Sequence, residues 1–443
     1  MITVSIPNTF IAERTYAVKA LLSALCGIEV DILVDPDQQD YLLRWESRSI
    51  VIKDYFFGKC SKSDGYATSA HLPSAVKSAT TTGLEGIIAI YGEEKFEASA
   101  DQIVCHVDLF AGVFFMLTRW EESLEGPRDQ HQRFPASKAA IVKAGFILRP
   151  VVDEYAALMR NWLQSLGYAV PEDKATFTVV PSCDVDMPLY WCSKPLWKSL
   201  GGRWLQHHRI TQTWRDYKEY KEVLRGKRQD PFDTYNYLMD LAEKSGIRFT
   251  FNFIGGGQTQ YEGTYSITDP FIVDLMRRIQ ARGHGIGIHP SYTSSENPSI
   301  IAAEKKAVEQ SAGMTLTTSR QHYLRFKVPD TWRYLDQAGI REDSTMGYAA
   351  EPGFRCGTSK PFQVFDIHKR QTLSLIERPL LIMDVSFKMY KQFDIEKSIS
   401  LCQTIEQQVK KHHGELGLLW HNSSLSEIDG WSGWNRVLET LMP

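Results

Sequence analysis

Two aspartates at the end of an apolar segment are the residues of this chain best placed for chemistry. Asp184 and Asp186 follow residues 176–183, a run rich in β-branched and aromatic residues that predicts a buried strand. Side chains at positions i and i+2 of a strand point to the same side. One carboxylate could therefore bind a metal ion while the other stays free as a base. The structural alternative is a turn at the strand end that uses aspartate as a local cap.

Histidines end two further apolar segments. His289 follows residues 286–288 and precedes a proline, and His421 follows residues 416–420. Neutral imidazole is a common zinc ligand, and a histidine at the edge of a site can also protonate a departing amine. The alternative for each is a structural histidine at the junction of strand and loop. His284 has the position of a turn residue.

A third polar group lies between these histidines in the sequence. Within residues 319–326, Arg320 and His322 are separated by one residue and share a face if the segment is extended. An arginine beside an active-site carboxylate would keep that carboxylate ionised, whereas on a surface strand both charges would simply be solvated. The irregular, glycine-containing loop at 341–362 adds the polar candidates Asp343, Ser344 and Arg355.

These residues require a framework of strands that end at a common edge. Helical segments separate several of the predicted strands, which lie at 176–183, 248–254, 285–289, 380–385 and 416–421. Such alternation predicts an α/β fold, as a (β/α) barrel or an open parallel sheet. The preceding sequence predicts a smaller α/β unit with a buried helix within 104–122. We therefore expect two domains, at 1–170 and 174–443.

The composition argues against several functional classes. The chain has 443 residues and a net charge of −3, which gives no electrostatic reason to expect binding of nucleic acid. Its seven cysteines are irregularly spaced without a Cys-x-x-Cys pair, which favours free thiols in a reducing compartment. No apolar run approaches the ~18–20 residues that span a bilayer, and the first residues lack signal-peptide features. We expect a cytoplasmic protein, and the sequence leaves its oligomeric state open.

Residues 190–228 stand apart because tryptophans are interleaved there with lysines and arginines. One interpretation is a solvated helical insertion whose basic side chains lie along apolar surface. The other is a surface for anionic glycans, nucleotide-sugar phosphates or lipid head groups, which would allow contact with a membrane surface. The spacing of the residues does not separate the two.

The order of the chemically promising segments resembles that of the NodB-homology polysaccharide deacetylases, carbohydrate esterase family 4, over residues 174–443. Asp184-Val185-Asp186 matches the first motif of that family, and Gly283-His284-Gly285-Ile286-Gly287-Ile288-His289 matches its second. Arg320 stands for the third motif, Asp343 is the candidate for the fourth, and Leu418-Leu419-Trp420-His421 matches the fifth. The resemblance implies a distorted (β/α)7-type barrel, and the N-terminal part resembles an uncharacterised domain that precedes such barrels.

The resemblance also implies roles. Asp184 would be the base and Arg320 its brace, His421 the acid, and Asp343 a residue that orients a side chain of the site. Asp186 and His289 would bind a divalent metal, which we expect to be zinc. The family usually has a second metal-binding histidine four residues after the first, where this chain has Thr293. His322 is the candidate for the missing nitrogen ligand, and a metal completed by water or no metal at all are the alternatives.

The predicted function is that of a metal-dependent hydrolase. It would remove an N-acetyl or similar acyl group from a sugar, such as a nucleotide sugar or lipid-linked glycan, in surface-polysaccharide biosynthesis. A catalytically inactive glycan-binding or scaffold protein is one rival, favoured by Thr293. A metal-independent amidohydrolase on the same fold is the other.

Overall fold

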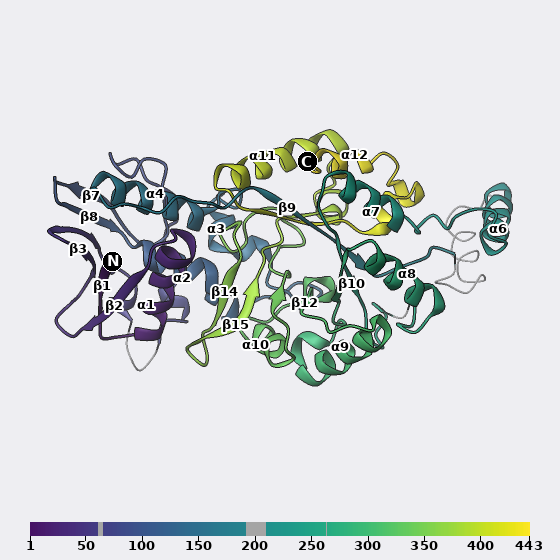
Figure 1. Cartoon of the computed structure of the whole chain (residues 1–443), viewed down its shortest axis with the longest axis horizontal. Coiled ribbons are helices and arrows are strands. Elements are labelled where there is room, and N and C mark those ends of the chain that lie inside the picture. Colours follow the sequence, from purple (N-terminus) through teal and green to yellow (C-terminus); the bar gives the residue numbers. More distant parts are fainter. Residues whose placement is uncertain (61–64, 192–209, 263) are drawn as a thin grey trace. The chain divides into compact units, whose positions relative to one another are not determined.

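The chain packs into two compact units in a computed structural model that describes residues 1–60, 65–191, 210–262 and 264–443 (Figure 1). Unit 1 consists of Met1–Thr178, Tyr323–Ile382 and Thr404–Gly417. Unit 2 consists of Val179–His322, Met383–Gln403 and Leu418–Pro443. The predicted boundary at 170–174 lies close to the first boundary between the units, at Thr178. The predicted domains do not include the two later segments, Tyr323–Ile382 and Thr404–Gly417, that belong to unit 1. The division into those two domains remains a prediction.

Unit 1 contains a mixed sheet of six strands in the order β2-β1-β3-β4-β8-β7. The strands are β1 (Ile2–Pro7), β2 (Val30–Asp35), β3 (Tyr41–Trp45), β4 (Arg48–Ile52), β7 (Gly92–Ala98) and β8 (Gln102–Val107). Alternate residues of β1 are fully buried, as expected for a strand with one face on a core. The helices of this part are α1 (Ile11–Val18), α2 (Leu109–Thr118), α3 (Ala140–Lys143) and α4 (Val151–Ser165).

Helix α2 is the buried helix expected within 104–122, and all of its residues are buried. It begins after Asp108, whose carboxylate accepts a hydrogen bond from the amide of Ala111 at 3.0 Å. Residues 104–107 belong instead to β8, in which Val104 and Cys105 pair with β4 in parallel register and Val107 pairs with β7. The helix prediction is therefore correct in place but too long at its N-terminal end.

Residues 323–382 also belong to unit 1. They form α10 (Asp330–Gln337) and the strands β13 (Glu342–Asp343), β14 (Phe362–Asp366) and β15 (Gln371–Glu377). A buried ion-pair cluster connects this segment to the N-terminal part: Nε of Arg355 lies 3.1 Å from Oε1 of Glu122, which also accepts a hydrogen bond from Tyr348 at 3.0 Å. Arg355 is thus part of the interior of unit 1.

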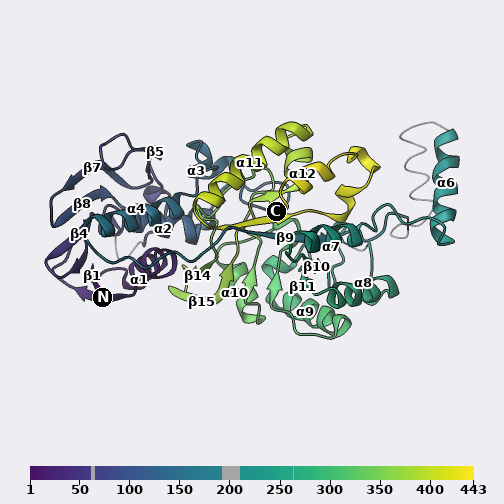
Figure 2. The ribbon, with the colours of Figure 1, turned by 45° about the horizontal axis from the view of Figure 1, so that its top comes forward.

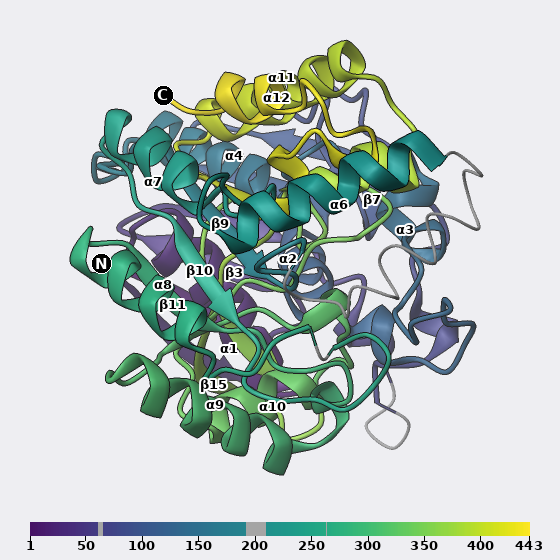
Figure 3. The same ribbon diagram turned by 90° about the vertical axis from the view of Figure 1, so that its right-hand side faces the viewer.

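Unit 2 is built on parallel strands that alternate with helices. The order β12-β11-β10-β9-β17-β16 joins β9 (Thr178–Val185), β10 (Thr250–Phe253), β11 (Gly285–Ile288), β12 (Thr318–Ser319), β16 (Ile382–Met383) and β17 (Glu415–Leu419). The helices between or after them are α6 (Ile210–Leu224), α7 (Tyr235–Lys244), α8 (Pro270–Ala281), α9 (Pro298–Ala312), α11 (Ile395–Lys411) and α12 (Asn435–Thr440). Figures 2 and 3 show α8 and α9 alongside β11. The predicted α/β class with a parallel sheet is confirmed.

Two expectations about membranes have different outcomes. Over the part of the chain that the structure describes, no helix is long and apolar enough to cross a bilayer. Residues 192–209 of the tryptophan-rich stretch 190–228 lie outside the described residues. Contact of that stretch with a membrane surface therefore remains a prediction.

Candidate active site

The predicted site residues of unit 2 come from the C-terminal ends of neighbouring parallel strands. Asp184 lies near the end of β9, and His289 and Arg320 directly follow β11 and β12. Parallel register places Asn252 of β10 opposite both Asp184 and Gly287. The carboxyl ends of parallel strands meet at one edge, which is where α/β enzymes carry their ligands. The short apolar strands therefore bring residues from 184 to 320 into one place.

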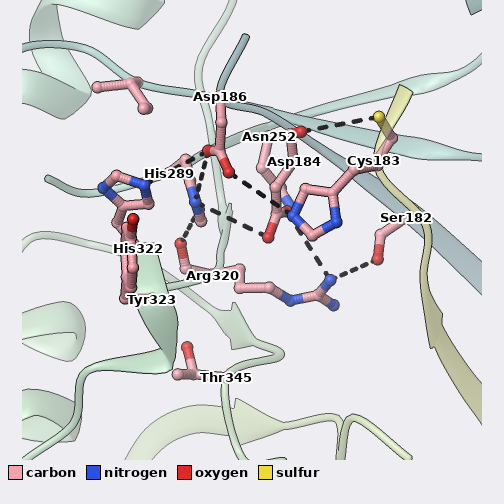
Figure 4. Close-up of polar contacts among 12 residues, drawn as sticks. Ser182, Cys183, Asp184, Asp186, Asn252, His289, Arg320, His322, Tyr323 and Thr345 are labelled. Carbon is pink, nitrogen blue, oxygen red and sulfur yellow. Dashed lines mark hydrogen bonds and ion pairs between the residues drawn. The ribbon is translucent and has the colours of Figure 1, made fainter. Parts of the chain in front are cut away.

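Asp186, His289 and His322 form a group that could hold a metal ion, with one donor atom from each lying within 4.8 Å of the others. Nε2 of His289 is 3.3 Å and Nε2 of His322 is 3.6 Å from Oδ1 of Asp186 (Figure 4). Thr293, four residues after His289, is exposed at the start of a short 3-10 helix. The structure thus brings His322 to the group, as the sequence-based hypothesis required.

The chemistry of this group fits a divalent cation. Oδ1 of Asp186 is buried and has no hydrogen-bond donor among the described residues. Burial raises the pKa of Asp186, but the imidazoles of His322 and His289 outweigh it and keep that pKa well below its usual range. Nδ1 of His289 lies 2.6 Å from the carbonyl oxygen of Arg320, which can only accept, so that Nδ1 carries the proton. In the neutral ring Nε2 then presents its lone pair, as a zinc ligand requires.

Asp184 lies beside this group without belonging to it. Its Oδ1 accepts a hydrogen bond of 2.7 Å from the amide of Asn252, and its Oδ2 is 3.8 Å from Nε2 of His289. Nη1 of Arg320 lies 3.8 Å from Oδ1 of Asp184 and donates to the hydroxyl of Ser182 at 2.6 Å (Figure 4). All of these side chains are buried. Asp184 is therefore a fixed carboxylate beside the group of Asp186, His289 and His322.

His421 follows β17 and is held by a carboxylate that sequence reasoning missed. Its Nδ1 and its backbone amide each lie 2.8 Å from an oxygen of Asp384, which is fully buried. Its Nε2 is 3.6 Å from Oδ2 of Asp186. Burial lowers the pKa of His421, but Asp384 and Asp186 more than compensate and raise it to about 10. The two carboxylates therefore favour the protonated imidazole, the form that a general acid requires.

Asp384 and Asn252 carried signals in the sequence. Asp384 follows the apolar residues 380–383, in the same way as Asp184 follows its own strand. Asn252 lies inside a predicted strand, and only its register with β9 shows that it touches Asp184. Asp343, the candidate for the acidic motif, belongs to unit 1, where its carboxylate accepts hydrogen bonds from the amide and hydroxyl of Thr345 at 3.1 and 3.0 Å. Its role in the site remains a prediction.

His284 has a structural role, as its position in a turn indicated. Its Nδ1 accepts a hydrogen bond from the amide of Phe249 at 3.1 Å, and its Nε2 lies 3.4 Å from Glu243. It precedes β11, whereas His289 follows that strand. The two histidines of the Gly-His-Gly-Ile-Gly-Ile-His segment therefore lie at opposite ends of one strand.

Comparison with known proteins gives separate results for the two parts of the chain. Residues 2–168 match the model of a family of unknown function, DUF7033. No curated protein matches the chain. A protein from Mycobacterium smegmatis assigned to the polysaccharide deacetylases is 16% identical, with a TM-score of 0.38 over 61% of this chain and 83% of its own.

Two further solved structures are similar to a comparable share of the chain. One is assigned to the polysaccharide deacetylases of Pseudomonas aeruginosa PAO1, with 10% identity and a TM-score of 0.39 over 63% of this chain and 89% of its own. The other is a CE4 family pseudoenzyme from Bacillus anthracis, with 10% identity and a TM-score of 0.30 over 60% of this chain and 62% of its own. These similarities cover about 60% of the chain, whereas the family of unknown function matches its N-terminal part.

Proposed function

We propose that unit 2 is a metal-dependent hydrolase that removes an N-acetyl or similar acyl group from a sugar. One observation carries this proposal: the donor atoms of Asp186, His289 and His322 lie within 4.8 Å of one another, and Asp184 stands beside them. A cluster of two imidazoles and a carboxylate is the kind of donor set that zinc prefers. A fixed carboxylate outside the donor set is what general-base catalysis needs.

Each residue of the site has a place in this proposal. A zinc ion on Asp186, His289 and His322 would polarise the amide carbonyl and lower the pKa of water at the site. Asp184 accepts the proton of the attacking water, while Asn252 and Arg320 fix its orientation.

The acid function falls to His421. It delivers a proton to the departing amine, and Asp384 holds its ring through Nδ1 so that Nε2 faces the site. Because a neutral amine is a far better leaving group than its anion, this proton transfer is needed for the carbon–nitrogen bond to break. The pairing of a buried carboxylate with a rim histidine supports catalysis over simple binding.

The substrate class is proposed on the order of the sequence motifs. An N-acetylated sugar, presented as a nucleotide sugar or a lipid-linked glycan in surface-polysaccharide biosynthesis, fits the resemblance to polysaccharide deacetylases. We place this reaction in the cytoplasm. The rival proposal of an inactive glycan-binding protein is favoured by Thr293. This residue is exposed, and it stands where the family usually has its second metal-binding histidine.

The test combines metal analysis with measurement of acetate release from several N-acetylated sugars by the full chain. We expect bound zinc and acetate release, with Asp184→Asn abolishing turnover but retaining zinc. His289→Gln should lose zinc, whereas His284→Gln, at the other end of the same strand, should keep it. Zinc without acetate release would favour the binding protein. Turnover without zinc would favour a metal-independent amidohydrolase.

A further inference from the structure

Glu262 contacts the histidine that occupies the unusual position in the candidate metal site. It lies in the loop between β10 and α8, and its side chain is fully buried. Its Oε1 is 3.5 Å from Nδ1 of His322. On its other side, Nε2 of His322 is 3.6 Å from Oδ1 of Asp186. The imidazole of His322 is therefore placed between two carboxylates, one at each ring nitrogen.

This placement determines which nitrogen of His322 faces the metal position. A carboxylate oxygen accepts hydrogen bonds, so that Glu262 favours a proton on Nδ1. In the neutral ring, Nε2 is then left with its lone pair towards Asp186. His289 reaches the same state through the carbonyl oxygen of Arg320. Metal-binding histidines commonly donate their second N–H to a carboxylate or carbonyl group, which fixes both the tautomer and the ring orientation.

The carboxylate of Glu262 is itself anchored. It accepts hydrogen bonds from the amide of Thr259 at 3.0 Å, from the hydroxyl of Thr259 and from the amide of Tyr292. Burial of a carboxylate is costly unless it is hydrogen-bonded or paired. Thr259 meets that requirement at Oε2, and the amide of Tyr292 meets it at Oε1, the oxygen that also faces His322. Tyr292 follows His289 closely in the sequence, so that Glu262 connects the segments that carry both histidines.

The loop that carries Glu262 follows a tight path. Gly257 has φ of +100°, and a Cβ there would lie 2.8 Å from the carboxylate carbon of Glu262. A Cβ on Gly255 would lie 2.4 Å from the carbonyl oxygen of Glu304. Only glycine permits this close approach. The Gly-Gly-Gly segment at 255–257 therefore lets the loop pass between Glu304 and Glu262, and it is part of what places Glu262.

We infer that Glu262 is a positioning residue for the metal centre, which holds His322 in the tautomer and orientation of a metal ligand. This inference rests on the metal site of the proposed function and deepens it. In this proposal His322 supplies the nitrogen ligand that a histidine at position 293 would otherwise supply. Glu262 contacts Nδ1 of His322 and thereby orients its ring. Glu262 itself does not belong to the group of metal-binding donors.

The experiment measures zinc affinity of the full chain by competition with a chromogenic chelator, a readout that needs no turnover. Glu262→Gln keeps the shape of the side chain and should weaken zinc binding by about 10–100-fold, as other residues behind metal ligands do. Glu304→Gln is the matched control, because Glu304 is a buried glutamate that accepts a hydrogen bond of 2.8 Å from the neighbouring amide of Ser291. It should change the affinity less than about threefold.

A second readout separates this inference from the proposed function. In metal-free protein labelled with nitrogen-15 at histidine, the spectrum of His322 reports its tautomer, with the assignment made on His322→Gln. We expect protonated Nδ1 in the wild type and a shift towards protonated Nε2 in Glu262→Gln. Failure of the wild type to bind zinc would refute the metal site, but the spectrum of the metal-free protein would still report the tautomer of His322. Unchanged affinity and tautomer in Glu262→Gln, or an equal loss of affinity in Glu304→Gln, would overturn the inference.

Discussion

The assignment of His322 as the third protein ligand yields the most decisive prediction. Removing its imidazole with His322→Ala takes one of the three donors away from the group. Zinc sites with four ligands bind with about 10–16 kcal/mol, so that each ligand is worth roughly 3–4 kcal/mol. Because about 1.4 kcal/mol corresponds to a tenfold change, zinc affinity should fall by about 10²–10³-fold.

The assay is chelator competition at fixed pH, with Thr293→Ala as the control. Thr293 occupies the position of the usual second histidine but is exposed, and its removal should leave the affinity within about threefold of the wild type. Since His322 is buried, the metal-free variants should first be compared by thermal denaturation, and His322→Asn offers a smaller change of volume. An affinity of the folded His322 variants equal to the wild type, or a comparable loss in Thr293→Ala, would refute the ligand assignment.

Three further predictions concern catalysis and stability. His421→Gln should lower kcat by about 10²–10⁴-fold without loss of zinc, and Asp384→Asn should lower it by a smaller factor; acetate release and metal analysis of the same samples check both. Arg355→Met should cost about 3–5 kcal/mol in urea denaturation, because it removes one cation from the buried carboxylate of Glu122; a cost below ~1 kcal/mol would contradict this. Burial lowers the pKa of His412 to about 4, whereas the unfolded chain takes up this proton below pH ~6.5. Stability should therefore fall by up to about 3 kcal/mol as the pH decreases from ~6.5 to ~4, and denaturation of His412→Phe over this range should lack that part of the fall.

The elements that position the site could be predicted from local sequence. Residues 176–183 and 285–289 contain apolar runs that end in aspartate or histidine, and these features depend on neighbours within a few positions. The structure places β9 and β11 at those segments and brings Asp186 and His289 together at their ends. The hypothesis that His322 joins them came from the family resemblance, which implies a second metal-binding histidine where this chain has Thr293.

The tertiary structure alone decided which side chains support these residues. Asp384 and Asn252 form hydrogen bonds to residues that are far away in the sequence, His421 and Asp184, and Glu262 makes a charged contact with the equally distant His322. No local pattern records such a contact, since strand register and the path of the 255–262 loop create it. Periodicity and residue type therefore determine which polar residues stand at the ends of strands. Packing determines which of these residues contact one another, because contacts between distant segments depend on the whole fold.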